Sequence, residues 1–375
     1  MNASLITYIQ NILQLRGKFS AISRVEKDSE TMKVWARWII THRSLCTQHN
    51  LILPDDEEYD SQFIVELQEK GVTRAHSEYL HDWLISECRS INSHYCPIAT
   101  VESGGLHASK SKSKSKSKPK TEPEPGSEHV VVSNASGHTT LVCTNMPQTI
   151  PTIVYNRMAR TYLGLPLQKN SYIWLCATIY SILDGKGLQW AVPPPVMELL
   201  QSSLGCYTEL FASPLNAYNK QYYSLFPLDK MFGSKGNVFT APDADFQEGT
   251  FQINPPFIDQ LFAKTSERVL ELLDKADANA KDLTFIYVMP EWKDFTTYNM
   301  IAESRFCVKR IYLRSGQHYY YQYSNGTYIP ARFGSYMFFL STNSKICSNT
   351  LESNIRYAFL GRQPNTSFYA KHKYK

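Results

Sequence analysis

Hydrophobic side chains recur at every third or fourth position through the first hundred residues, which is the spacing of one face of an α-helix. The spacing is regular at Ile6, Ile9, Ile12 and Leu13, and it returns at Val34, Trp35, Trp38 and Ile39 and at Tyr79, Leu80, Trp83 and Leu84. We therefore predict a helical N-terminal domain over residues 1–102, with one apolar face per helix.

A polar, low-complexity segment interrupts this pattern. Serine and lysine alternate from Ser109 to Lys118, Pro119 and Lys120 follow, and a stretch of Glu and Pro continues to Gly126. The segment has no apolar side chain to bury, its lysines repel one another, and its prolines interrupt helix and sheet. We predict a disordered linker over residues 103–136. In the simpler interpretation this linker is a passive tether. In the other, its lysines also attract RNA phosphates without sequence specificity.

Helical spacing resumes after the linker, over residues 150–163, 172–183 and 194–204. Three consecutive prolines at 193–195 suit the first turn of the last of these helices, where proline costs little. We predict a second helical domain over residues 137–204.

From residue 205 onwards, short apolar runs alternate with helical spacing. Strands are expected at 207–212, 251–253 and 283–289, a helix at 258–273, and an antiparallel edge at 310–313 and 335–340. This alternation indicates an α/β fold with a mostly parallel sheet over residues 205–345, followed by a C-terminal extension over 346–375.

Composition narrows the class of protein. Of the 375 residues, 43% are hydrophobic and 19% charged, enough for the cores of two or three domains. A net charge of +5 and 13% aromatic residues suit an anionic partner whose bases stack on rings, without requiring one. No run of 18 apolar residues predicts a membrane span, and no secretion signal is evident. The eight scattered cysteines fit neither a zinc site nor a disulfide framework, so we expect a reduced, soluble, intracellular protein.

The tetrapeptide Asn254-Pro255-Pro256-Phe257 is the sharpest chemical feature of the sequence. It follows a predicted strand and precedes a predicted helix, where open α/β sheets bind their ligands. The Asn254 side-chain oxygen and the Pro255 carbonyl could accept both N–H groups of an amine on an aromatic ring, and so restore the nucleophilicity that conjugation removes. Phe257 offers a face for a purine, and the electrophile would be the methyl group of S-adenosylmethionine, which needs no metal. The competing interpretation is a tight turn with a core Phe.

A second candidate element, Phe211-Ala212-Ser213-Pro214-Leu215-Asn216, also follows a predicted strand. Its small residues and Asn216 could admit the amino-acid end of the cofactor, although the glycine-rich turn usual in methyltransferases is missing. Taken alone, an ordinary strand-to-helix turn is the simpler interpretation.

Further motifs occur in a fixed order around these two elements. They are Gly187-Leu188-Gln189 to Pro194, Glu209-Leu210 before the second element, Lys220-Gln221-Tyr222, Phe232-Gly233-Ser234-Lys235-Gly236, Gly249-Thr250-Phe251, Pro290-Glu291-Trp292 and Ser315-Gly316-Gln317-His318. The set resembles the cap-specific adenosine N6-methyltransferases, the phosphorylated-CTD-interacting-factor family. The resemblance covers residues 185–345, extends loosely to the helices at 150–185, and does not include residues 1–135.

This resemblance implies a Rossmann-like, S-adenosylmethionine-dependent methyltransferase domain packed against a helical domain, with capped RNA bound between them. The family methylates the exocyclic amine of the first transcribed adenosine after the 7-methylguanosine cap. Carried over by motif, the catalytic residues are Asn254, Pro255, Pro256 and Phe257. The cofactor would be flanked by Phe211, Ser213, Pro214, Asn216, Asp243 and Asp259, and the RNA by Lys220, Lys235, Arg314 and His318. Asp259 could instead only complement a helix dipole, and each lysine could be a solvated surface charge.

The sequence departs from the family pattern in two places. No pair of tryptophans has the spacing of a WW domain, so we expect no WW-type contact with the polymerase tail. Lys235 stands where the family has arginine, which keeps the charge but loses the bidentate fork.

His318 precedes three tyrosines, Tyr319 to Tyr321, which suit either an RNA path or a half-buried strand or hairpin. His318 as a general base is less plausible, because the amine proton can leave after methyl transfer without strong basic help.

Two other functions stay open at this stage. One is the same chemistry on adenine in DNA or internal RNA, and the other is a cap-binding module without catalysis, which would have no use for the amide acceptor pair. The site of action would be the nucleus in a cell and the cytoplasm for a virus. If residues 1–102 fold separately, a chain starting near Thr140 should keep its preference for capped RNA that begins with adenosine.

Overall fold

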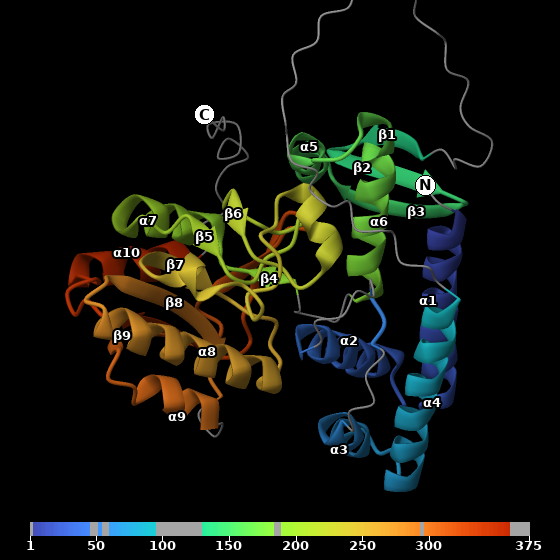
Figure 1. Cartoon of the computed structure of the whole chain (residues 1–375), viewed down its shortest axis with the longest axis horizontal. Helices are drawn as coiled ribbons and strands as arrows, with labels where there is room; N and C mark the ends of the chain where they lie inside the picture. The colour runs from blue at the N-terminus through green and yellow to red at the C-terminus, as the bar shows by residue number, and fades with distance from the viewer. Residues whose placement is uncertain are drawn as a thin grey trace, which may run out of the picture.

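The computed structural model describes residues 3–45, 52–54, 60–94, 130–183, 189–292 and 296–360. Most of the predicted linker therefore lies outside the described residues. A helical part with a small sheet packs beside a layered α/β part (Figure 1). No helix in the described ranges has both the length and the apolar character that crossing a bilayer requires.

The N-terminal part consists of helices, as the hydrophobic spacing predicts. These are α1 (Ala3–Ile22), α2 (Asp28–Leu45), α3 (Ser61–Glu69) and α4 (Arg74–Ser93). Their apolar stripes are buried, with Ile9, Trp35 and Leu80 removed from solvent. The side chain of Asp60 caps α3 by accepting the Phe63 amide at 3.0 Å, which satisfies one of the free N–H groups of the first turn.

A three-stranded antiparallel sheet follows, where the sequence interpretation expected the end of the linker and helices. It contains β1 (Val131–Ala135), β2 (His138–Cys143) and β3 (Met146–Pro151), in that order. Its two turns place Ser136, Gly137, Thr144 and Asn145 at positive φ, which is how two-residue hairpin turns match the twist of their strands. The prediction of an entirely helical segment over 137–204 is therefore wrong, and the linker cannot extend to residue 136.

The hydrophobic core of the N-terminal helices continues without a break into the next helices, α5 (Thr152–Thr161) and α6 (Lys169–Ile182). Trp174 of α6 is fully buried and donates its indole N–H to the Met146 carbonyl at 2.9 Å. Residues of α1, α2, α4, β2 and α6 all belong to this one core. The helices before and after the linker thus pack as a single body.

A six-stranded sheet organises the rest of the chain. Its strands are β5 (Thr208–Glu209), β6 (Gln221–Tyr222), β7 (Gly249–Ile253), β8 (Leu283–Pro290), β9 (Cys307–Leu313) and β12 (Ser335–Ser341). They lie in the order β6-β5-β7-β8-β12-β9, and the first four are parallel. The predicted mostly parallel sheet is confirmed. The antiparallel strand β12 lies between β8 and β9 rather than at an edge.

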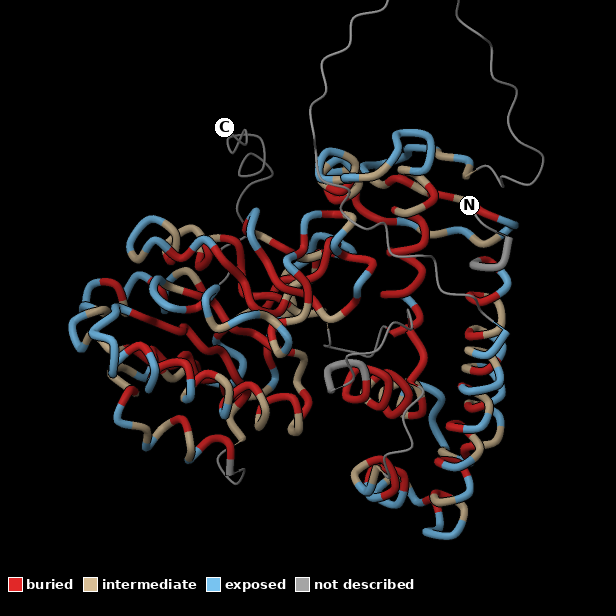
Figure 2. The backbone as a smooth tube through the Cα atoms, in the orientation of Figure 1, coloured by how far each residue is buried: buried red, intermediate tan, exposed pale blue. Residues whose placement is uncertain are grey.

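Helices cover both faces of this sheet (Figure 1). Along β8, Phe285, Tyr287 and Met289 pack towards α8 (Asp259–Ala278) and α9 (Thr296–Ala302), as the alternation of a strand requires. The intervening Ile286 and Val288 pack towards α7 (Pro194–Leu204) and α10 (Asn349–Phe359). Figure 2 shows the central strands buried along their length. The domain boundaries predicted at 204 and 345 are therefore misplaced, because α7 and α10 both contribute to the core of the α/β part.

A second small sheet borders the large one. The hairpin of β10 (Tyr319–Gln322) and β11 (Thr327–Pro330) pairs with β4 (Trp190–Ala191), the short strand between α6 and α7. The hairpin interpretation of the tyrosine-rich stretch is confirmed. The pairing brings Trp190 next to residues of the large sheet that are far away in sequence.

Candidate active site

The candidate site lies where the direction of the chain through the large sheet reverses. From β5 the chain moves to β6 on one side and then returns to β7 on the other side of β5. The loops that follow β5 and β7 therefore diverge and leave a crevice at the carboxyl ends of the strands. A cavity opens there, enclosing about 490 Å³ of space, its mouth included. It is lined by Ile40, Tyr180, Leu183, Gln189, Trp190, Phe211, Ala212, Ser213, Asn216, Ser224, Leu225, Phe226, Asn254 and Pro256.

Asn254 presents a buried acceptor in this cavity. Its side chain is 8% exposed, and its Nδ2 donates to the Trp190 carbonyl at 2.9 Å. Its Oδ1 atom is buried without a hydrogen-bond partner. An unsatisfied buried acceptor costs about 1–3 kcal/mol, so it marks a place where a ligand donor is needed.

The other residues of the tetrapeptide divide between the cavity and its surroundings. Pro256 lines the cavity, and its carbonyl accepts the Ile258 amide at 2.7 Å, which fixes the turn into α8. Pro255 is buried. Phe257 is half-buried and does not line the cavity, because its ring packs edge-on against Tyr320 and Phe333, with ring centres 5.6 and 5.8 Å away. Stacking of Phe257 on adenine stays a prediction.

The loop after β5 is held by side chains that line the cavity. Asn216 Oδ1 accepts from the Ser213 amide at 2.7 Å and from its hydroxyl at 3.0 Å. Gln189 in turn accepts from Asn216 Nδ2 at 3.4 Å. Phe211, Ser213 and Asn216 thus line the same cavity, and their contact with a cofactor stays a prediction. Gln189 joins them unpredicted, although the Gly187-Leu188-Gln189 motif had included it.

Two charged residues that do not line the cavity hydrogen-bond to the backbone of this loop. Arg157 of α5 donates to the backbone carbonyls of Ala217 and Pro214, at 2.8 Å for Pro214. Glu209 accepts the amides of Tyr218 and Asn219 at 2.8 and 2.6 Å. Burial raises the pKa of Glu209 to about 7, against the lowering effect of these two bonds. Pro214 therefore contributes through its backbone rather than as part of the cavity wall.

A buried carboxyl group lies directly behind the cavity wall, and sequence reasoning missed it. Asp229 is fully buried and accepts the Tyr180 hydroxyl at 2.6 Å. Burial raises its pKa to about 7, while hydrogen bonds from Tyr180 and Ser224 oppose the rise. Tyr180 and Ser224 both line the cavity, so Asp229 fixes two wall residues at once. No local pattern in the sequence links these three positions.

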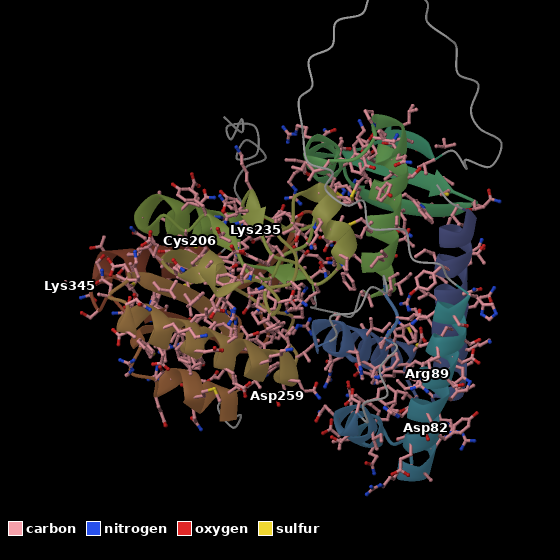
Figure 3. All side chains as sticks on the ribbon, viewed as in Figure 1. Asp82, Arg89, Cys206, Lys235, Asp259 and Lys345 are labelled. Carbon is pink, nitrogen blue, oxygen red and sulfur yellow. The ribbon has the colours of Figure 1, made fainter. Side chains whose placement is uncertain are left out.

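The two predicted cofactor carboxylates lie elsewhere. Asp243 is 45% exposed and pairs with Lys275 and Arg268 of α8 at 2.7 and 2.6 Å, and these hydrogen bonds lower its pKa. Asp259 begins α8, where burial raises its pKa and the charge of Arg37 lowers it (Figure 3). Neither residue lines the cavity.

The predicted RNA contacts divide into one buried residue and three exposed ones. His318 is fully buried, with Nδ1 and Nε2 hydrogen-bonded to the Arg314 carbonyl and the Ser335 hydroxyl at 2.9 and 2.8 Å. The RNA contact predicted for His318 is therefore wrong, because the strands around it exclude any ligand. Lys220, Lys235 and Arg314 are exposed and do not line the cavity. Lys235 lies beside β6, its Nζ 5.7 Å from the centre of the Tyr223 ring (Figure 3).

Metal ligands do not gather at this site. Within the described ranges, no group of three or more His, Cys, Asp or Glu side chains is arranged to hold a metal ion.

Comparison with known proteins finds relatives of this region. Residues 167–323 match a protein-family model described as the phosphorylated CTD interacting factor 1 WW domain. A Mus musculus protein named mRNA (2'-O-methyladenosine-N(6)-)-methyltransferase is 37% identical over 144 residues, which make up 37% of this chain and 19% of that protein. A Homo sapiens protein of the same name is 36% identical over 144 residues, with the same shares. The chain thus matches about a fifth of the length of these relatives.

The description of the family model names a WW domain, but the matched residues form a different structure here. They run from α6 through the parallel strands β5 to β8 to the hairpin strand β10. The match therefore covers most of the cavity wall.

Proposed function

Because residues 167–323 match the phosphorylated CTD interacting factor 1 family model, we propose that the protein is an S-adenosylmethionine-dependent RNA methyltransferase. Its substrate is capped RNA, and it methylates N6 of the first transcribed adenosine. The names of the two relatives give the 2'-O-methylated form of adenosine as their substrate. The observation that carries the proposal is the buried, unpartnered Oδ1 of Asn254 in the cavity at the strand ends.

The architecture supports a Rossmann-like methyltransferase domain. The four parallel strands lie on both sides of the crevice, with β5 and β6 on one side and β7 and β8 on the other. β12 lies antiparallel between β8 and β9. Helices cover both faces of the sheet, and the cavity lies at the topological switch point, where doubly wound sheets bind their ligands.

The residues of the cavity fit the cofactor. The cavity wall combines apolar rings with a few polar groups, which is the make-up of small-molecule sites in proteins. Phe211, Ser213 and Asn216 would hold the cofactor from the loop after β5, and Ser224 from the loop after β6. When bound there, S-adenosylmethionine supplies a methyl group on an electrophilic sulfonium.

The tetrapeptide would prepare the nucleophile. Asn254 Oδ1 and the Pro255 carbonyl accept the two N–H groups of adenine N6, which draws the nitrogen lone pair out of conjugation with the ring. Because the Asn254 amide is fixed through Nδ2 on Trp190, its acceptor is in place before the substrate arrives. The methylated nitrogen then loses one proton to water.

The test is mass spectrometry of nucleosides after incubation with S-adenosylmethionine. The substrate is a capped RNA that begins with adenosine, with or without 2'-O-methylation. Uncapped RNA, capped RNA that begins with guanosine and an adenine-containing DNA duplex serve as matched controls. We expect N6-methylation of the cap-adjacent adenosine alone. Methylation of internal or DNA adenine would favour the second enzyme function, and absence of methylation on every substrate would overturn the proposal.

A further inference from the structure

Helix α2 is buried on two faces, and each face packs into a different hydrophobic core. Val34, Trp35 and Trp38 pack into the core of the N-terminal helices. Arg37, Ile40 and Thr41 are spaced i, i+3, i+4 and therefore share another face of the same helix. A surface helix has one apolar stripe, so a second buried face requires a second structure to pack against.

That second structure is the α/β part, and Ile40 reaches its core. Ile40 is 2% exposed and joins the hydrophobic cluster that contains Phe211, Ile258 and Phe262. Among the described residues of α1 to α4, it alone belongs to that cluster. It also lines the cavity together with Asn254 and Pro256.

The neighbours of Ile40 on the same face contact the start of α8. The Thr41 hydroxyl donates to Gln260 Oε1 at 3.4 Å, and the charge of Arg37 acts on Asp259. Figure 1 shows α2 facing the N-terminal end of α8, and Figure 3 labels Asp259 at that end. This first turn of α8 follows the tetrapeptide directly.

We propose that the N-terminal helices form part of the ligand site, with Ile40 as a wall residue for an adenosine group. The inference rests on the proposed function, since both the cofactor and the target nucleoside contain adenine. An aliphatic side chain can pack against the flat face of a purine, but it offers a phosphate neither a hydrogen bond nor a charge. The neighbour of Ile40 is therefore a base rather than the RNA backbone. The site is therefore composed of segments more than 200 residues apart in the chain.

The test compares Ile40→Ala with Ile39→Ala in the full chain. Both residues are buried isoleucines of α2, but Ile39 packs only in the N-terminal core and does not line the cavity. Both variants should lose thermal stability, because each leaves a cavity in a core. Only Ile40→Ala should raise the calorimetric Kd for S-adenosylmethionine or the KM for capped RNA, by at least about five-fold, since one apolar contact is removed. The Kd arm reports on cofactor adenine and the KM arm on target adenine.

Ile40→Val, which retains most of the wall, should fall between wild type and Ile40→Ala, and it serves as the folded variant if Ile40→Ala does not fold. Equal Kd and KM values for the Ile40 and Ile39 variants would overturn the inference while the proposed function stands. Failure of the wild-type protein to bind S-adenosylmethionine would overturn both.

Discussion

Single residues at the candidate site depend on partners that come from distant parts of the chain. The Asn254 amide is oriented by the carbonyl of Trp190, and the Asp229 carboxyl by the hydroxyl of Tyr180. Trp190 lies between α6 and α7, and Tyr180 belongs to α6. The chemistry of the large sheet is therefore fixed from outside the sheet.

Asn254→Ala should lower methyl transfer by at least ~100-fold, because it removes a positioned acceptor for the amine that is methylated. The cost in stability should be only about 0.5–1.5 kcal/mol, since the variant loses the bond to Trp190 and removes an unsatisfied oxygen. Steady-state transfer to capped RNA and calorimetry with S-adenosylmethionine measure the two effects. Asn279→Ala is the control, since this exposed asparagine also donates to a backbone carbonyl. Near-normal turnover in Asn254→Ala would refute the role of the tetrapeptide.

Asp229→Asn should change how stability depends on pH. The folded-state pKa of about 7 lies above the ordinary value of 3.8, so between about pH 4 and 7 the folded state holds a proton that the unfolded state has released. The wild-type protein therefore loses stability from this group as the pH rises through that window. Asparagine cannot ionise, so the variant should gain stability relative to wild type as the pH rises from 5 to 8.

Urea denaturation at pH 5, 6.5 and 8 measures this difference. Asp245→Asn is the matched control, because Asp245 also accepts a tyrosine hydroxyl, that of Tyr223 at 2.7 Å, but is exposed. Parallel curves for Asp229→Asn and wild type would contradict the assigned burial effect.

Which residues could be predicted follows from how local their signals are. Asn254 and Pro256 were predicted because strand, turn and helix are adjacent in the sequence, and Ser213 and Asn216 for the same reason. Asp229, Gln189 and Ile40 reach the cavity only through tertiary packing. His318 shows the opposite error, because a histidine beside tyrosines has the composition of an RNA surface but is buried by pairing with Ser335.

At the scale of elements, long periodic segments were predicted well and short ones poorly. The amphipathic spacing of α8 indicates a helix, and the short continuous apolar run of β8, bounded by polar residues and proline, indicates a buried strand. The hairpins of β1 to β3 were missed although the signal was present, since β-branched residues flank Ser136-Gly137 and Thr144-Asn145. Helix α10 was assigned to an extension because nothing in its own sequence says which surface its apolar stripe covers.

Phe359→Ala should destabilise the protein by ~3–5 kcal/mol, because the ring of this α10 residue is fully buried against the sheet. Leu360→Ala should cost less than about 0.5 kcal/mol, since its side chain is 48% exposed. Chemical denaturation of the two neighbouring variants measures the difference. Equal, small losses for both would mean that α10 is not part of the core of the α/β part.

At the scale of the whole molecule, the core shared by α1–α4 and α5–α6 changes what truncation should do. A chain that starts near Thr140 lacks the four N-terminal helices and begins inside β2. It exposes buried surfaces such as Trp174 and removes Ile40 from the cavity. We therefore expect it to be unfolded or aggregated rather than selective for capped RNA, which replaces the expectation from sequence.

Circular dichroism and size-exclusion chromatography of this truncated chain, beside the full chain, measure the outcome. A monomeric, folded product with unchanged Kd for S-adenosylmethionine would show that the N-terminal helices are dispensable, contrary to the continuous core.

The position of β12 in the large sheet also determines when the molecule can be completed during synthesis. β12 is the last strand of the described chain and pairs on both sides, with β8 and with β9. While a nascent chain grows, the facing edges of β8 and β9 stay unpaired until residues 335–341 have left the ribosome, and open strand edges invite wrong pairing. The tetrapeptide at 254–257 is made well before that moment. The sheet that carries the candidate site is thus completed late in translation, by contacts between strands that are far apart in sequence.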